Sequence, residues 1–211
     1  MDRRGFLVGA AALSGVLAGC TSSSETTGPG ENASDGGEGV PPDISFEVAA
    51  LREDKTLPAR HTCDGTDISP ELIMTSIAPA VDSLAVVFLD TSVRPEPFVH
   101  WTLWDLPATI STIPAGVATR ERVEFETDAG GVEETVTVSQ GVNSSGSVGY
   151  VGPCPPEGDG RHVYGMRLYG LPEAPDVDPG AEWSALEPAL EESSLGRTVV
   201  TVWKENEGPS T

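Results

Sequence analysis

The alternation of apolar and polar residues predicts a chain built mainly of β-strands. Six segments either alternate in this way or are apolar throughout, as strands buried on one face or on both faces do. They are residues 44–48, 83–89, 98–106, 135–138, 163–171 and 198–203. Turns rich in Gly and Pro separate them, and the pattern therefore favours antiparallel sheets over repeated βαβ units.

One helix is expected near the C-terminus, over residues 182–192. Apolar residues recur there at spacings of three and four, the repeat of a helix with one buried face: Trp183, Leu186 and Leu190. Pro188 lies within this run and indicates an early turn or a break, and Gly196 is a suitable stop.

The first 20 residues have the features of an export signal. Arg3 and Arg4 form a twin-arginine pair, an apolar run too short to span a bilayer follows, and small residues precede Cys20. We interpret residues 1–20 as a twin-arginine lipoprotein signal. Cys20 would then be lipidated and would hold the exported protein at the outer face of the cytoplasmic membrane. The alternative is an ordinary N-terminal membrane anchor.

Composition divides the rest of the chain into three parts. Residues 21–41 are rich in Ser, Thr, Gly and acids and nearly devoid of apolar residues, which predicts a disordered tether. Residues 42–205 are long enough for one domain with its own core. Residues 206–211 form a short tail.

The charge of the chain excludes one class of partner. There are 33 acidic and 12 basic residues, giving a net charge of −21 at pH 7. The phosphates of a nucleic acid would be repelled, and we expect no such partner. The acids are scattered and lysines are rare, which resembles an adaptation to high salt. A general solubility device at lower salt is the alternative.

Two of the three histidines lie in distinctive segments. His100 stands in Pro-Phe-Val-His-Trp, and His162 follows the Pro- and Gly-rich residues 155–160. Imidazole changes its charge near neutral pH and can hydrogen-bond through both nitrogens. A site that holds both histidines could bind an anion, hold a metal or do acid–base chemistry. Each could also be an ordinary core residue.

Cysteine usage indicates one crosslink. If Cys20 is lipidated, Cys63 and Cys154 remain as a pair in an exported protein, where disulfides persist. We expect them to be bridged, with two buried thiols as the alternative.

Three segments taken together resemble a known family. They are residues 62–72, Asp90 followed ten residues later by His100 and Trp101, and residues 149–164. Their order and spacing are similar to those of the phosphatidylethanolamine-binding protein family, above all its prokaryotic Raf-kinase-inhibitor-like members. The resemblance covers roughly residues 44–203. It implies an antiparallel β-sandwich with a few short helices and a small anion pocket at one end.

The resemblance also implies which residues line that pocket, where the family accepts phosphoryl head groups and small anions. They are Asp90, His100, His162 and Tyr164. Two positions depart from the family pattern. Ser92 replaces the second acid of the Asp-Pro-Asp-Ala-Pro loop, and Val163 replaces the Arg between the His and the Tyr. Both departures are expected to alter the rim of the pocket, while its four lining residues match the family.

The residue types themselves suit an anion. Gly and Pro over residues 149–158 can bring backbone N–H groups close to it, both imidazoles can donate hydrogen bonds, and Tyr164 adds a hydroxyl. Asp90 is a poor direct contact for an anion. It would orient an imidazole and favour its protonated form, or accept from an ammonium head group.

Three further candidate residues lie in the segment 61–67, part of which belongs to the first of the three segments that carry the resemblance. His61 is a second candidate near the pocket mouth or, alternatively, a core residue. Asp64 and Asp67 are expected to be turn residues that bond their own backbone.

These observations favour a non-catalytic, cell-surface binding module for a small phosphoryl or other anion, without a cofactor. The resemblance offers an inhibitor of an extracellular protease as the alternative, although no inhibitory loop is identifiable. A metal-dependent enzyme is the third hypothesis, because one carboxylate and two imidazoles (Asp90, His100 and His162) can bind a transition metal. No Gly-x-Ser-x-Gly motif indicates nucleophilic catalysis.

Overall fold

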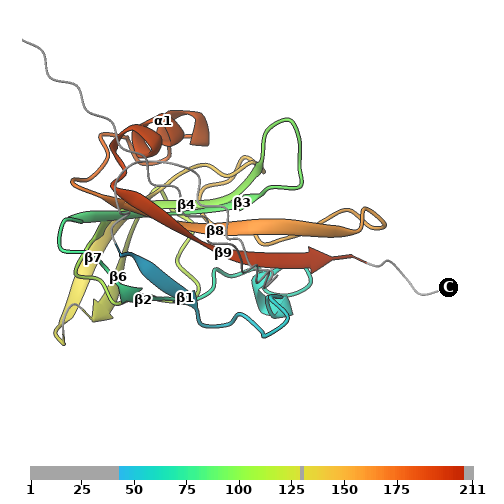
Figure 1. Cartoon of the computed structure of the whole chain (residues 1–211). Coiled ribbons are helices and arrows are strands. Elements are labelled where there is room, and N and C mark those ends of the chain that lie inside the picture. The colour runs from blue at the N-terminus through green and yellow to red at the C-terminus, as the bar shows by residue number, and fades with distance from the viewer. Residues whose placement is uncertain (1–42, 129–130, 207–211) are drawn as a thin grey trace, which may run out of the picture. The chain divides into compact units, whose positions relative to one another are not determined.

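Two antiparallel sheets form the domain in the computed structural model, which describes residues 43–128 and 131–206 (Figure 1). The large sheet has the order β6-β7-β4-β3-β8-β9 and the small sheet β1-β2-β5. The strands of the large sheet are β3 (Ser83–Asp90), β4 (Phe98–Pro107), β6 (Arg122–Asp128), β7 (Glu133–Gln140), β8 (Arg161–Leu171) and β9 (Gly196–Glu205). Those of the small sheet are β1 (Ser45–Val48), β2 (Leu72–Ser76) and β5 (Thr112–Ile113).

Two short helical segments accompany the sheets. A 3-10 turn, η1, covers Ala59–His61, and the helix α1 covers Trp183–Ser193. Figure 1 shows α1 on one side of the large sheet and the small sheet on the other. The helix continues through Pro188 and ends at Ser193, so the expected stop at Gly196 is wrong; this residue begins β9.

The central strand β3 is buried on both faces of the large sheet. Its alternate side chains enter two cores. Leu84, Val86 and Phe88 belong to the core between the two sheets, which also contains residues of β1 and β2. Ala85, Val87 and Leu89 belong to the core beneath α1. The uninterrupted apolar run in the sequence thus corresponds to a strand with no solvent-facing side.

The prediction of a mainly β, antiparallel sandwich with one helix near the C-terminus is confirmed. The proposed signal (1–20) with its Cys20, the tether (21–41) and residues 207–211 of the tail lie outside the described residues. Across residues 43–128 and 131–206, no helix combines the length and apolar character needed to cross a bilayer.

Candidate functional site

The fold brings the four predicted site residues to one end of the large sheet. Asp90 is the last residue of β3, His100 lies in β4, and His162 and Tyr164 lie near the start of β8. Since β3 pairs with both other strands, Asp90 stands opposite Phe98 on one side and Tyr164 on the other. All four residues are at most 7% exposed.

A β-bulge positions His100. Phe88 pairs with Trp101 and Leu89 pairs with Val99, which leaves His100 as the extra residue of β4. Its ring packs against three aromatic rings, with centroid distances of 4.8 Å to Phe98 and 5.3 Å to both Phe88 and Tyr164. The bulge therefore places an imidazole beside Tyr164.

His162 is held between two carboxylates. Its Nδ1 donates to Asp90 Oδ2 over 2.6 Å, and its Nε2 lies 3.1 Å from Asp159 Oδ2. Burial alone would lower the pKa of His162, but the two carboxylates outweigh burial and raise that pKa. Each nitrogen faces an acceptor, as suits the doubly protonated imidazolium. Asp90 thus orients an imidazole and favours its charged form.

His100 has the opposite character. Its Nδ1 lies 2.7 Å from the carbonyl oxygen of Val151, which can only accept, and Nδ1 therefore carries the proton. Burial lowers the pKa of His100, and the neutral form leaves a lone pair on Nε2. In this neutral form His100 offers an acceptor at Nε2, where a donor was expected from the sequence.

The hydroxyl of Tyr164 completes the cluster. The residue is 1% exposed, and its buried hydroxyl lies near the Asp90 carboxylate without forming a hydrogen bond of good geometry to any described residue. Burial, followed by the nearby charge of Asp90, raises the pKa of this tyrosine, which keeps its proton at any ordinary pH. The Tyr164 ring packs against both imidazoles, with ring centroids 5.3 Å apart for His100 and 6.3 Å apart for His162.

Comparison with known proteins identifies the family. The sequence profile of the phosphatidylethanolamine-binding protein family matches residues 47–204. The chain belongs to the phosphatidylethanolamine-binding protein family.

Several relatives and solved structures agree with this membership. The UPF0098 protein PH1269 of Pyrococcus horikoshii is 33% identical over 149 residues, which cover 70% of each chain. A UPF0098 protein of Methanothermobacter thermautotrophicus is 33% identical over 72% of this chain and 93% of its own. The E. coli family member YbcL superimposes with a TM-score of 0.65 at 24% identity, covering 77% of this chain and 98% of YbcL. At that identity the structural likeness shows the shared fold.

The two departures from the family pattern meet in space. Ser92 Oγ accepts a 2.8 Å hydrogen bond from the backbone N–H of Val163, and the Ser92 N–H donates to Asp90 Oδ1 over 2.8 Å. Thr91 also donates to the carbonyl of Val163 through its N–H and its hydroxyl. The altered loop after Asp90 is therefore hydrogen-bonded to β8, and its Ser92 N–H holds Oδ1 of Asp90.

A crosslinked pair of loops supports His100 from the other side. Cys63 and Cys154 form a disulfide with Cα atoms 5.5 Å apart. Tyr150 donates its hydroxyl to the carbonyl of His61, and the Gly152 N–H donates to Asp67 Oδ1. A Cβ on Gly152 would meet that Asp67 oxygen at 2.3 Å, so the contact requires glycine. These bonds hold the segment that carries the Val151 carbonyl.

Hydrogen bonds within the domain occupy several groups of these loops. Within residues 149–158, the N–H group of Gly152 bonds Asp67 and that of Val151 bonds the His100 carbonyl, so these two already have acceptors. Asp67 and Asp64 bond other segments rather than their own turn; Asp64 pairs with Lys204. His61 is fully buried between Arg60 and the Ile68 carbonyl, which is the environment of a core residue.

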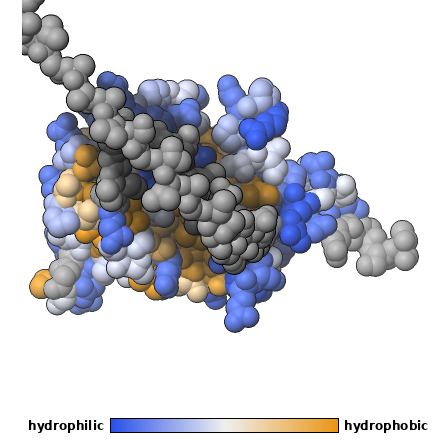
Figure 2. Space-filling model, viewed as in Figure 1, coloured by the Kyte–Doolittle hydropathy of each residue, from blue (hydrophilic) through white to orange (hydrophobic). Residues whose placement is uncertain are grey.

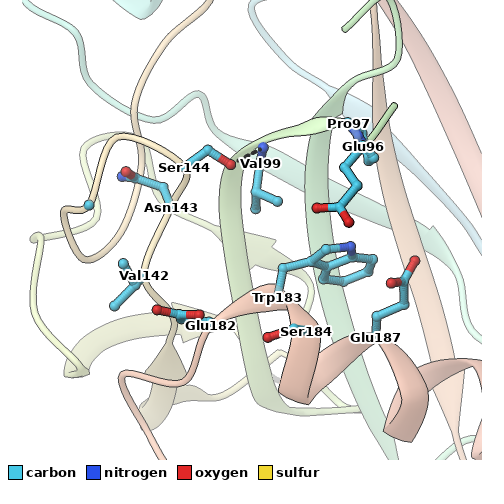
Figure 3. A pocket seen from close by; sticks show the side chains of 11 residues that line it. Glu96, Pro97, Val99, Val142, Asn143, Ser144, Glu182, Trp183, Ser184 and Glu187 are labelled. Atoms are coloured by element: carbon cyan, nitrogen blue, oxygen red, sulfur yellow. Dashed lines mark hydrogen bonds between the residues drawn. The ribbon is translucent and has the colours of Figure 1, made fainter. Parts of the chain in front are cut away.

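The cavities of the surface lie elsewhere. None of three cavities along the described residues is lined by Asp90, His100, His162 or Tyr164. Figure 3 shows one of about 470 Å³, in which Glu96 and Glu187 lie beside the Trp183 ring and Glu182 lies further along. No basic residue lines it, and an anion would be repelled there.

A metal site has no ligand set in this part of the chain. Within residues 43–128 and 131–206, no group of three or more His, Cys, Asp or Glu side chains is arranged to hold an ion. Asp90 and His162 bond each other, and His100 faces the Tyr164 ring.

Proposed function

We propose that this domain is a non-catalytic binding module for a small phosphoryl anion at the end of the large sheet. The observation that carries the proposal is the buried Tyr164 hydroxyl, which forms no hydrogen bond of good geometry to a described residue and belongs to a ring 5.3 Å from that of His100. A buried hydroxyl without a partner costs roughly 1–3 kcal/mol. A ligand that accepts from this hydroxyl would offset that cost, and family membership supports the same role.

The chemistry of the cluster favours a phosphoryl group that carries a proton. Tyr164 supplies a donor for a phosphoryl oxygen, and His100 supplies an acceptor for a P–OH group. Asp90 is neutralised by the imidazolium of His162, so its charge does not oppose the ligand directly. The net charge of −21 repels anions at long range, and salt screens this repulsion.

Calorimetry with inorganic phosphate and phosphoethanolamine tests the proposal, in moderate and in high salt. Tyr164→Phe should weaken binding about tenfold, because one hydrogen bond to a buried group is lost. Tyr169→Phe is the matched control. Tyr169 is equally buried in β8, but its hydroxyl bonds Glu191 under the other face of the sheet. No binding by the wild type, or equal binding by the two variants, would overturn the proposed function.

We propose further that the domain is displayed outside the cell, held at the cytoplasmic membrane through Cys20. The support is the sequence alone: the twin-arginine pair, the short apolar run and the cysteine that follows small residues. Fatty-acid labelling of the wild type and its loss in Cys20→Ser would support this. A Cys20→Ser protein that stays in the membrane fraction would contradict it.

A further inference from the structure

Asp159 contacts the buried cluster from the solvent side. Its side chain is 60% exposed, whereas those of its neighbours His162 and Asp90 are 9% and 5% exposed. It lies in the turn before β8, which projects from the end of the large sheet (Figure 1). Its carboxylate covers Nε2 of His162, the nitrogen that Asp90 leaves unused.

We propose that Asp159 is an internal competitor for the anion ligand: its carboxylate occupies the His162 Nε2–H that a phosphoryl oxygen would otherwise accept from. This inference rests on the proposed function and concerns the same site. It assigns His162 a donor directed at the ligand, in addition to the Tyr164 hydroxyl. An incoming anion must displace Asp159 before it can use that donor.

The turn allows such a displacement. Gly158 and Gly160 flank Asp159 with φ values of +78° and +80°, and a Cβ on either would meet no atom within 4 Å. The backbone is anchored, since the Gly158 N–H bonds the Asn206 carbonyl and the Asp159 N–H bonds the Pro156 carbonyl. Rotation of the Asp159 side chain alone would turn its carboxylate toward solvent. Hydrophilic residues cover this end of the domain, where β9 ends (Figure 2).

The charges support competition rather than a structural clamp. Asp90 already gives the His162 imidazolium a buried counterion at 2.6 Å. The second carboxylate makes the trio net negative, which disfavours an anion, and an exposed ion pair contributes little to folding. A carboxylate and a phosphoryl oxygen accept the same hydrogen bond, so one can replace the other.

Phosphate titration of the full-length protein compares Asp159→Ala with Glu157→Ala. Glu157 is exposed in the same turn, and its removal changes the net charge equally without uncovering His162. We expect Asp159→Ala to bind inorganic phosphate roughly two- to fivefold more tightly than wild type, the range of an exposed ion pair. Glu157→Ala should bind like wild type.

Each outcome decides the inference. Tighter binding by Asp159→Ala alone supports it, as does phosphate binding that appears only in that variant. Unchanged or weaker binding by Asp159→Ala overturns the competitor and leaves the proposed function standing. An equal gain in both variants also overturns it, because only net charge then matters. No binding by wild type or either variant overturns both proposals.

Discussion

His162 donates a hydrogen bond of 2.6 Å to Asp90 across 72 residues of sequence, because β8 and β3 are neighbours in the large sheet. This pair supplies a buried positive charge together with its own counterion. His100, which packs against the same Tyr164 ring, bonds the Val151 carbonyl rather than a carboxylate, and burial lowers its pKa and favours its neutral form. Two imidazoles in one cluster therefore differ in charge, and the difference determines what each can offer a ligand.

The first prediction concerns the titration of the three histidines. The carboxylates of Asp90 and Asp159 outweigh burial and raise the pKa of His162, whereas burial lowers the pKa of His100 and of His61. Because the chain has three histidines, an NMR titration should show one imidazole above 6.5 and two below it. Asp90→Asn should lower the pKa of His162 and leave His61 unchanged. A His162 that titrates below 6.5 would contradict this account.

The same shifts give stability a dependence on pH. The raised pKa of His162 contributes stability that is present below its unfolded value of about 6.5 and is lost as pH rises through the folded value. The lowered pKa values of His100 and His61 act oppositely, since stability falls as pH drops below about 6.5. Urea unfolding measured from pH 5 to 9 should therefore show a loss of stability at the high end of this range, through His162, and another at the low end, through His100 and His61. His162→Gln should abolish the loss at high pH alone.

The second prediction separates stability from binding. Tyr164→Phe removes a buried hydroxyl that forms no hydrogen bond of good geometry to a described residue, and the free energy of unfolding should stay equal or rise by about 1 kcal/mol. Tyr169→Phe breaks the hydrogen bond to Glu191 and should lower the free energy of unfolding by about 1 kcal/mol. Denaturant melts of both variants measure the difference. A Tyr164→Phe protein less stable than Tyr169→Phe would mean that the hydroxyl has a structural partner.

The sequence predicted the strands that alternate or are wholly apolar, and it missed those with weaker signals. β6 was not predicted although Val123, Phe125 and Thr127 alternate with exposed residues, because this edge strand is mostly charged. β5 has two residues, too few for any periodicity. Pro188 suggested a break in the helix, which the buried Leu186 and Leu190 on either side override through packing.

The four residues of the candidate site were implied by the family resemblance that its motifs carry, but their hydrogen bonds were not. The acceptor at His100 Nε2 was not foreseen, because a bulge and the Val151 carbonyl, both tertiary features, fix the tautomer of this residue. Asp159 went unnoticed for a related reason. It looked like an ordinary turn residue, although its position three residues before His162 was a signal that the two could meet.

The third prediction concerns the disulfide. Cys63 and Cys154 are 91 residues apart, and closing so long a loop restricts the unfolded chain strongly. A Cys63→Ser, Cys154→Ser protein should lose roughly 2–4 kcal/mol of unfolding free energy. The measurement is the denaturant midpoint with and without reductant. Reductant should lower the midpoint of the wild type and leave the double variant unchanged; a shift in both would point to another thiol or to a reductant artefact.

The fourth prediction follows from the lone pair on His100 Nε2. Near pH 6 inorganic phosphate and phosphomonoesters carry a P–OH group, whereas sulfate has no proton to donate. Sulfate would place an acceptor against the acceptor Nε2 of His100, a mismatch worth about tenfold or more in affinity. Competition calorimetry at pH 6 should therefore rank phosphate at least about tenfold above sulfate. His100→Phe keeps a ring among Phe88, Phe98 and Tyr164 but has no acceptor, and the preference should disappear. If wild-type protein binds both anions equally, His100 does not accept from the ligand and its nitrogen serves packing alone.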